Sequence, residues 1–324
     1  MTLRLGVVGA GVMGRKVAAA AAQIDGVRVS AVVDRDDNRA TALAGTHDTH
    51  AHESIADLVD SDVVDAVYIG VPHHQHLSAC LEAAGAGFHV LIDKPLCNTL
   101  EEADQIMAAR DAAGIKLMVG FSYRFRAEWI AARDAVAAGE IGAPRLVVDT
   151  IIEAETSTPG WYWDGAAGGG VLQLQSHHCF DRLAWVLGER FASVGCQVSA
   201  TAAAAEDIAI INGTTGAGTL VSIDLGFGRS YRSASRATTI IQGELGHIVI
   251  DTARNVSVAS GDGRLRSLSY ADDDWLLQEV TAFVGLCTGA DGAVPGAEDG
   301  RAALACALAA TRSARAGGPA LSLF

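Results

Sequence analysis

Three glycines near the start of the chain have the spacing of a phosphate-binding turn. Gly9, Gly11 and Gly14 stand at G-x-G-x-x-G spacing, with Val12 and Met13 between the last two. In such a turn the first glycine permits the bend, the second lets a pyrophosphate approach the backbone, and the third lets a helix pack on a strand. The N–H groups that open the following helix then point at the phosphates. The alternative is an ordinary strand–turn–helix unit without a ligand.

A carboxylate further along favours the dinucleotide interpretation. Asp34 ends a second apolar run, Val27–Val33, and lies 25 residues after Gly9 (34 − 9 = 25). The acid that binds the adenosine ribose is expected about 20 residues on. Its carboxylate would accept a hydrogen bond from the ribose 2′-hydroxyl and would repel a 2′-phosphate, which predicts NAD rather than NADP. Arg35 works against this preference, because an arginine can accommodate that phosphate.

A polar segment, Thr46–His52, contains three histidines. A metal site is one interpretation of this segment. No cysteine or second cluster completes a ligand set, so a solvated connection is favoured and no metal is predicted.

The elements that position these residues alternate between strand and helix up to about residue 122. Val63–Val71 and Phe88–Ile92 are apolar runs typical of buried parallel strands, and Thr99–Ala113 begins with a capping box. The alternation predicts a doubly wound parallel sheet, a Rossmann fold. Ligands bind such sheets beyond the carboxyl ends of the strands, so one cleft should collect the glycine turn, Asp34, Val71–His76 and Asp93–Pro95.

After residue 122 the pattern changes. A helix over 126–138 and a strand over 145–154 precede an aromatic loop over 156–165 and a helix over 171–187. Seven strand-like runs follow, at 194–200, 208–212, 218–225, 237–242, 247–251, 255–259 and 265–270. Helices over 275–286 and 300–316 close the chain. We therefore predict two domains: a dinucleotide-binding domain, 1–122, and an α+β domain with a large, mostly antiparallel open sheet, 123–324.

Composition limits the partners. The chain has 324 residues, 50% of them hydrophobic, with 24 basic and 38 acidic residues and a formal charge of −14. This charge disfavours nucleic acid and anionic membranes as partners. No apolar run reaches the about 18 residues of a membrane span. No signal peptide is recognisable before the first strand, and the six cysteines lack C-x-x-C spacing. Reduced thiols in a cytoplasmic protein are the expectation.

Several segments together resemble one family. Val71–His76 is similar to a T-P-x-x-x-H segment, and Asp93-Lys94-Pro95 stands where an E-K-P motif is usual. Val119–Phe125 resembles a strand-to-domain crossing, and Gly168–Gly170 precedes an H-x-x-D pair, His178 and Asp181. With the glycine turn, these motifs follow in order from end to end. The chain thus resembles the glucose–fructose oxidoreductase and inositol dehydrogenase family.

The resemblance implies a dehydrogenase of a sugar, cyclitol or related polyol, with the substrate between cofactor and second domain. Oxidation removes a hydride, which nicotinamide accepts, and a proton, which the protein must accept. Lys94 would contact the reacting oxygen and His178 would move the proton, a role that suits histidine. Asp181, three residues on, could orient the ring. The family often has an aspartate four residues before this histidine, and here Leu174 stands there.

The predicted site also includes residues that bind the cofactor and the substrate. The predicted cofactor-binding residues are Gly9, Gly11, Val12, Met13, Gly14, Asp34, Arg35, Val71, Pro72, His73, His76, Asp93 and Lys94. The predicted substrate-binding residues are Lys94, Tyr123, Glu153, Trp161, Trp163, Gln175, His177 and His178.

Alternatives remain for parts of this site. The tryptophans could form a stacking wall for sugar rings or pack in the core. Glu153 and Glu155 could bond hydroxyls or face water, and both His177 and His178 could be core or interface histidines. A homodimer or homotetramer is expected. A cofactor-binding regulator and an NAD-dependent glycosidase are the alternative functions, and net NAD turnover with a polyol distinguishes them from a dehydrogenase.

Overall fold

The fold is known from a computed structural model, which describes residues 2–61, 63–154, 160–164, 169–200, 205–228, 235–270, 274–290 and 292–323. Glu155, Gly168 and the side chain of Trp161 lie outside this described part. The contacts divide the chain into unit 1, residues 1–125 with 274–301, and unit 2, residues 126–273 with 302–324. The sequence predicted a single boundary at residue 122, so residues 274–301 lie in a different unit from the one expected.

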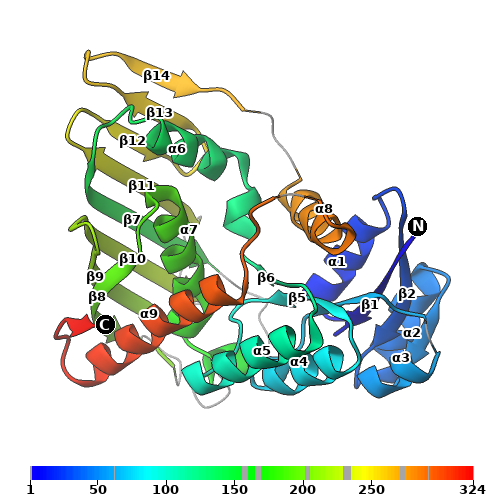
Figure 1. The fold of residues 1–324 in the computed structure, drawn as a ribbon. Helices are drawn as coiled ribbons and strands as arrows, with labels where there is room; N and C mark the ends of the chain where they lie inside the picture. Colours follow the sequence, from blue (N-terminus) through cyan, green and yellow to red (C-terminus); the bar gives the residue numbers. More distant parts are fainter. Residues whose placement is uncertain are drawn as a thin grey trace. The chain divides into compact units, whose positions relative to one another are not determined.

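Unit 1 contains a six-stranded sheet with the order β3-β2-β1-β4-β5-β6, and every strand pair is parallel (Figure 1). Its strands are β1 Leu3–Val8, β2 Val27–Val33, β3 His50–His52, β4 Ala66–Ile69, β5 His89–Asp93 and β6 Leu117–Gly120. Its helices are α1 Val12–Ala21, α2 Asp37–Thr46, α3 Ile55–Ser61, η1 His73–Gln75, α4 His76–Gly85, α5 Leu100–Ala113, η2 Ser122–Phe125 and α8 Trp275–Thr288. The predicted doubly wound sheet is confirmed.

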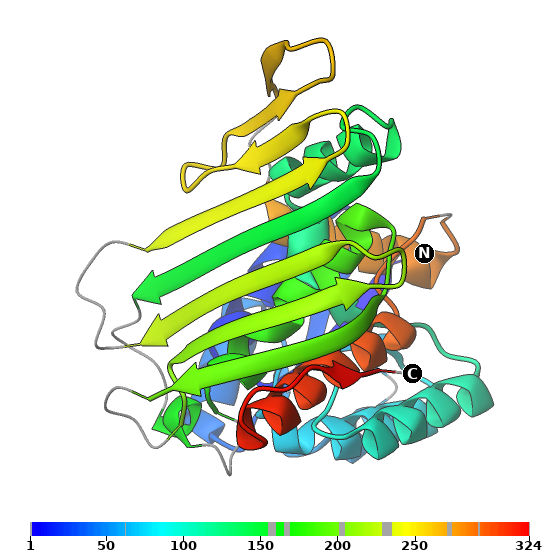
Figure 2. The same cartoon turned by 90° about the vertical axis from the view of Figure 1, so that its left-hand side faces the viewer.

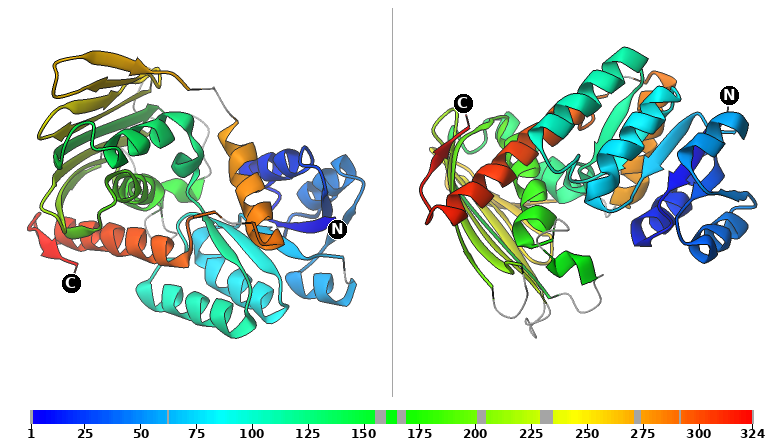
Figure 3. Two further views of the ribbon diagram at one scale, coloured as in Figure 1. Left: turned by 45° about the horizontal axis from the view of Figure 1, so that its top comes forward. Right: turned by 90° about the horizontal axis from the view of Figure 1, so that it is seen from below.

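Helix α8 joins this sheet from far along the chain. Leu276, Val280 and Phe283 share a core with Val17 of α1 and Leu5 of β1, and the two helices lie side by side (Figure 3). The three α8 residues recur at helical spacing, so they form one apolar stripe that is buried against the sheet layer. This burial explains why residues 274–301 belong to unit 1.

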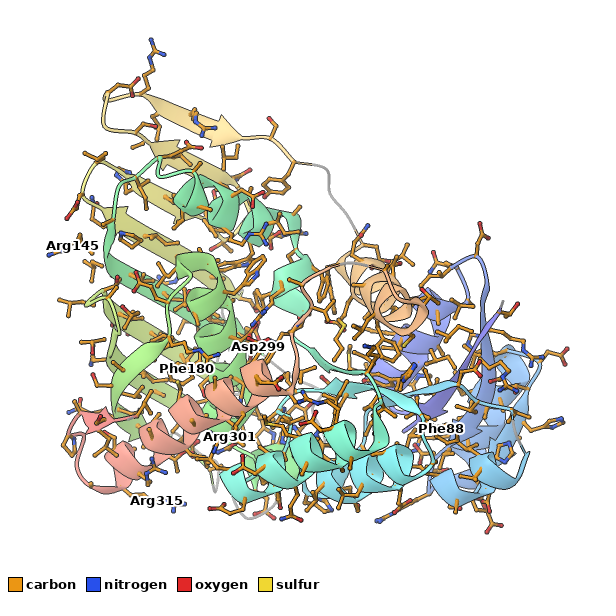
Figure 4. All side chains as sticks on the ribbon, viewed as in Figure 1. Phe88, Arg145, Phe180, Asp299, Arg301 and Arg315 are labelled. Atoms are coloured by element: carbon orange, nitrogen blue, oxygen red, sulfur yellow. The ribbon has the colours of Figure 1, made fainter. Side chains whose placement is uncertain are left out.

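Ion pairs also hold the first residues of α9, Ala297–Arg315, within unit 1, whose second segment ends at Arg301. Arg110 pairs with Glu298 at 2.8 Å, and Arg124 pairs with Asp299 at 2.9 Å. Arg301 reaches Asp104 on α5 at 2.6 Å; Asp299 and Arg301 are labelled in Figure 4. Such partly exposed pairs contribute little each, so we regard the apolar stripe of α8 as the main anchor.

The histidine-rich segment is not a single polar loop. His50, Ala51 and His52 form β3, which pairs with β2 through Ala31, Val32 and Val33. The expected loop is therefore wrong over these three residues. The free edge of β2 offers unpaired backbone groups, and this pairing satisfies them even though the segment has a polar composition.

Unit 2 is built on a nine-stranded sheet with the order β14-β13-β12-β11-β7-β10-β9-β8-β15 (Figure 2). Its strands are β7 Pro144–Ala154, β8 Phe191–Ser199, β9 Ile208–Thr215, β10 Leu220–Gly228, β11 Arg236–Gly243, β12 His247–Ile250, β13 Val256–Ala259, β14 Leu265–Leu268 and β15 Leu321–Ser322. Its other elements, beside α9, are α6 Ala127–Ala137, η3 Gly160–Trp163, η5 Leu172–Ser176 and α7 His177–Leu187. Only β7 and β10 pair in parallel, so the predicted mostly antiparallel sheet is confirmed.

The two faces of this sheet differ. Val147 and Ile151 of β7 are buried on the face that α6 and α7 cover, and Phe180 of α7 packs edge-on against Phe191 at 5.0 Å. On the opposite face Leu146 is 40% exposed and Ile210 is 45% exposed. Figure 2 looks onto this face, and no described helix lies over it. Arg145, labelled in Figure 4, extends from the same sheet away from α7.

Candidate active site

The glycine turn of unit 1 has the geometry that its spacing predicts. Gly9 has φ +102°, and a Cβ there would lie 2.5 Å from the Gly70 carbonyl oxygen. A Cβ on Gly14 would lie 1.9 Å from the Gly9 carbonyl oxygen, so this position is closed by the protein itself. A Cβ on Gly11 would meet nothing within 4 Å. The one open glycine position thus faces space that a ligand can take.

The start of α1 next to this space is suited to an anion. Gly11 is the N-cap residue and provides no side-chain hydrogen bond to the first turn. Val12, the first helical residue, is 61% exposed, which is unusual for a large apolar side chain. The unsatisfied N–H groups of a helix N-terminus bind phosphate, so these residues fit the pyrophosphate of a dinucleotide.

Asp34 is built into the same turn. Its Oδ2 accepts the Ala10 N–H at 2.7 Å, and its Oδ1 accepts the Asp36 N–H at 2.9 Å. Arg39 lies 3.3 Å from Asp34 Oδ1 and 3.1 Å from Asp36 Oδ2. The carboxylate therefore holds the turn and carries an arginine partner. Arg35, which the sequence singled out, is exposed.

A hollow of about 310 Å³ adjoins Arg39, the arginine that contacts Asp34. It is lined by Arg15, Asp36, Asn38, Arg39, Ala42, Leu43 and Thr46. Sequence reasoning missed Arg15 and Arg39. Their signal was positional: Arg15 directly follows Gly14, and Arg39 lies one turn into the helix after Asp34.

The other predicted residues of unit 1 gather at the carboxyl ends of β4 and β5. Lys94 is half-buried, and its backbone N–H donates to Asp93 Oδ1 at 2.8 Å. Asp93 Oδ2 lies 3.5 Å from the hydroxyl oxygen of Tyr68. Val71 and Pro72 are half-buried in the neighbouring loop. An ammonium held at a strand end can stabilise the alkoxide that develops on a substrate hydroxyl.

The remaining predicted residues of unit 1 vary in exposure. His73 is buried and His76 is fully buried, whereas Met13 and Tyr123 are half-buried.

In unit 2 the two adjacent histidines differ in access. His177 is fully buried, and its Nε2 lies 3.3 Å from Gln173 Oε1. His178 is half-buried, and Asp181, three residues on, is 4% exposed. Of the two rings, His178 has the accessible surface that a proton acceptor for a substrate needs.

A buried ion pair anchors this helix to the sheet. Arg182 donates to Asp149 Oδ2 of β7, and Thr239 of β11 donates to Asp149 Oδ1 at 2.6 Å. Both charged side chains are almost completely buried, and the guanidinium lies 4.6 Å from the ring centroid of Trp129. Sequence reasoning missed this pair, although an aspartate within an apolar strand was a visible signal.

The expected helix over 171–187 opens with a π-helical turn. This turn, η5, spans Leu172–Ser176 and leads directly into α7. Leu174, which stands where a site aspartate is common in the family that the sequence resembles, is 3% exposed. Glu153 of β7 accepts the Gln175 side-chain N–H at 2.9 Å, so a carboxylate from the neighbouring strand reaches this turn. Sequence reasoning singled out both residues but not their contact.

Glu206 supports the start of the same helix. Its Oε1 accepts the Leu172 N–H at 3.3 Å, and its carboxylate fills the space beside Gly170, where φ is +100°. Burial raises the pKa of Glu206 above its usual range.

The aromatic residues before this helix pack within unit 2. Trp163 stacks on Phe227 with a centroid distance of 5.6 Å, and Tyr162 lies 6.3 Å from the same ring. Trp163 and Tyr162 are both half-buried, so part of each ring packs within unit 2.

Within the ranges that the structure describes, no three His, Cys, Asp or Glu side chains gather in a way that could hold a metal ion. None of the helices in those ranges is long and apolar enough to cross a membrane.

Both parts of the chain are similar to known proteins. A family model described as an oxidoreductase family with an NAD-binding Rossmann fold matches residues 3–121, and a GFO/IDH/MocA C-terminal domain model matches residues 129–249. The chain is 30% identical to an inositol 2-dehydrogenase of Rubrobacter xylanophilus over 98% of this chain and 92% of that protein. It is 31% identical to an inositol 2-dehydrogenase of Rhizobium meliloti over 97% of each. The solved structure of an aldose-aldose oxidoreductase from Caulobacter crescentus has a TM-score of 0.88 at 22% identity, covering 99% of this chain and 100% of that one.

Proposed function

Because the chain belongs to the GFO/IDH/MocA family of oxidoreductases, we propose that it oxidises a hydroxyl carbon of a cyclitol, sugar or related polyol with NAD. The observation that carries this proposal is the glycine turn, in which only the Gly11 position opens onto free space. The two inositol 2-dehydrogenase relatives support a cyclitol as the substrate class.

The chain's own residues have distinct tasks in this reaction. Bound nicotinamide would accept the hydride from the alcohol carbon. The α1 N-terminus and Asp34 would hold the dinucleotide, and the Lys94 ammonium would stabilise the developing alkoxide. His178 would accept the hydroxyl proton, with Asp181 orienting its ring. Glu153, held by Gln175, would accept hydrogen bonds from further hydroxyls of the polyol.

A substrate panel tests this function. Purified protein is mixed with NAD and, in turn, with inositol isomers, aldoses and alditols, and reduced nicotinamide is followed by its absorbance. Net NADH formation with at least one polyol is expected. A protein that binds NADH but reduces no NAD with any member would favour the regulator, and release of a sugar from a glycoside without net NADH would favour the glycosidase.

We further propose that NAD is preferred over NADP, with Arg39 rather than Arg35 opposing the preference. Asp34 repels a 2′-phosphate, whereas Arg39 contacts this carboxylate and lines the adjacent hollow. Calorimetric Kd values for NADH and NADPH are the test. Asp34→Asn should bring the Kd for NADPH closer to the Kd for NADH, which narrows the ratio of the two Kd values. Arg39→Gln should widen the ratio, and Arg35→Gln should leave it unchanged. A wild-type preference for NADPH would contradict this assignment.

The assembly proposed is a homodimer or homotetramer formed through the open face of the nine-stranded sheet. Leu220 and Ile240 on that face are 56% and 39% exposed, and such apolar area is unusual on a monomer. Light scattering should give at least twice the mass of one chain, and Ile240→Lys should give a monomer. A monomeric wild type would contradict the proposal.

A cytoplasmic location is proposed from the thiols. All six cysteines are free, and burial raises the pKa of Cys179 to about 12, so this thiol stays protonated. Fractionation of the source cells with activity recovered outside the cytoplasm would contradict it.

A further inference from the structure

His76 contacts two loops at once. It is the first residue of α4 and is fully buried. Its Nδ1 lies 2.8 Å from the Pro95 carbonyl oxygen, and its Nε2 lies 2.9 Å from the Val71 carbonyl oxygen. Pro95 directly follows Lys94, and Val71 lies in the loop after β4. One imidazole therefore bridges the loops at the carboxyl ends of two neighbouring parallel strands, β4 and β5.

The chemistry of this bridge is demanding. Carbonyl oxygens only accept hydrogen bonds, and a neutral imidazole has one N–H whereas an imidazolium has two. Burial lowers the pKa of His76, and the charge of Asp93 and the surrounding carbonyls oppose this shift. The neutral ring therefore donates to one loop, and the protonated ring donates to both. The His73 ring, edge-on at 5.6 Å, packs against the bridge.

This geometry leaves the ring of His76 little surface for contact with a ligand. Both nitrogens face the main chain, and the side chain has no exposed surface. The sequence placed His76 among the cofactor-binding residues. We propose instead that His76 is a positioning residue, which ties the Lys94–Pro95 loop to the Val71 loop and acts on the reaction through Lys94. The effect on turnover rests on the proposed function, whereas the effect on the loops does not.

Hydrogen exchange of the backbone amides tests the bridge directly. His76→Gln keeps a polar side chain, but a flexible amide replaces the rigid ring whose two nitrogens lie 2.8 and 2.9 Å from the two carbonyl oxygens. Exchange in peptides covering residues 93–98 should rise about tenfold, the size expected when a buried hydrogen bond is lost. Peptides of β1 should exchange as in the wild type, which excludes global unfolding. His76→Asn is the second variant if His76→Gln does not fold.

The matched control is His74→Gln. His74 lies two residues earlier in η1 and is exposed, so its replacement should leave exchange over 93–98 unchanged. If both variants change exchange alike, or if neither does, His76 does not hold the loop and the proposal is overturned.

Kinetics with NAD and myo-inositol, or with the first polyol that the substrate panel identifies, test the role in the reaction. His76→Gln should lower kcat by about tenfold or more while the Kd for NADH stays within about threefold. A proportional loss of NADH affinity would make His76 a cofactor-binding residue and overturn the proposal. A wild type that binds NADH without oxidising any polyol would contradict the proposed function, and the exchange experiment would still decide the role of His76.

Discussion

Substitutions at the glycine turn can distinguish a position that is open to a ligand from a position that is closely packed within the protein. In Gly14→Ala the new Cβ would lie 1.9 Å from the Gly9 carbonyl oxygen, whereas ordinary contacts begin near 3.4 Å. Helix α1 or the turn would have to move by about 1.5 Å (3.4 − 1.9). Overpacking of this kind costs about 1–3 kcal/mol. The melting temperature should therefore fall by about 3–10 °C.

Gly11→Ala is the matched change. Its Cβ meets nothing within 4 Å, and Gly11 has φ −70°, which alanine adopts without strain. The melting temperature without cofactor should stay within about 2 °C of wild type. The methyl group would occupy the space intended for the pyrophosphate, so the Kd for NADH should rise by about tenfold or more.

Differential scanning calorimetry and isothermal titration with NADH measure both quantities on the same samples. The expected pattern is a stability loss in Gly14→Ala and an affinity loss without a stability loss in Gly11→Ala. If Gly11→Ala bound NADH like the wild type, the open position would not be the phosphate site. If Gly11→Ala melted as early as Gly14→Ala, the distinction between ligand space and packing would be refuted.

Three further changes probe the other parts of the site. Lys94→Ala should lower kcat by about 10²–10⁴ and spare NADH binding, and near-full activity would make Lys94 structural. His178→Ala should abolish oxidation and remove the acidic limb of the pH–rate profile, whereas His177→Ala replaces a buried ring and should lower the melting temperature. Equal kinetic effects, or a larger kinetic loss in His177→Ala, would contradict the assignment of His178 as the proton acceptor. Glu206→Gln should raise the melting temperature at pH 7–8. Because the pKa of Glu206 is raised in the folded state, the wild type loses stability as the pH rises through that pKa. The higher melting temperature of Glu206→Gln should therefore disappear in acid. An increase in melting temperature that does not depend on pH would contradict this prediction.

The amino-acid sequence by itself determined the features that rest on neighbouring residues. The G-x-G-x-x-G spacing predicted a turn at Gly9 and close helix–strand packing at Gly14. In the structure Gly9 has φ +102°, and a Cβ on Gly14 would lie 1.9 Å from a carbonyl oxygen. The alternation of strands and helices predicted the parallel sheet, which the structure contains. Such features follow from local periodicity and turn chemistry, which a single chain displays directly.

Tertiary structure alone decided the features that need partners distant in the chain. The apolar stripe of α8 could have covered either sheet, and only packing assigned it to unit 1. The strand formed by His50–His52 exists because β2 offered an open edge. The sequence could not reveal these outcomes, because composition and periodicity do not identify the segment against which an element packs.

The same limit applies to the side chains of the site. Asp149 and Arg182 are 33 residues apart, and the buried pair forms only once α7 lies on the sheet. Glu153 meets Gln175 across strand and helix, and His76 joins two loops through carbonyl oxygens that belong to no motif. Residue types and spacing thus identified the chemistry available to this protein. Burial and long-range hydrogen bonds, which arise only when separate elements pack, decided which side chains are held in place and which remain accessible.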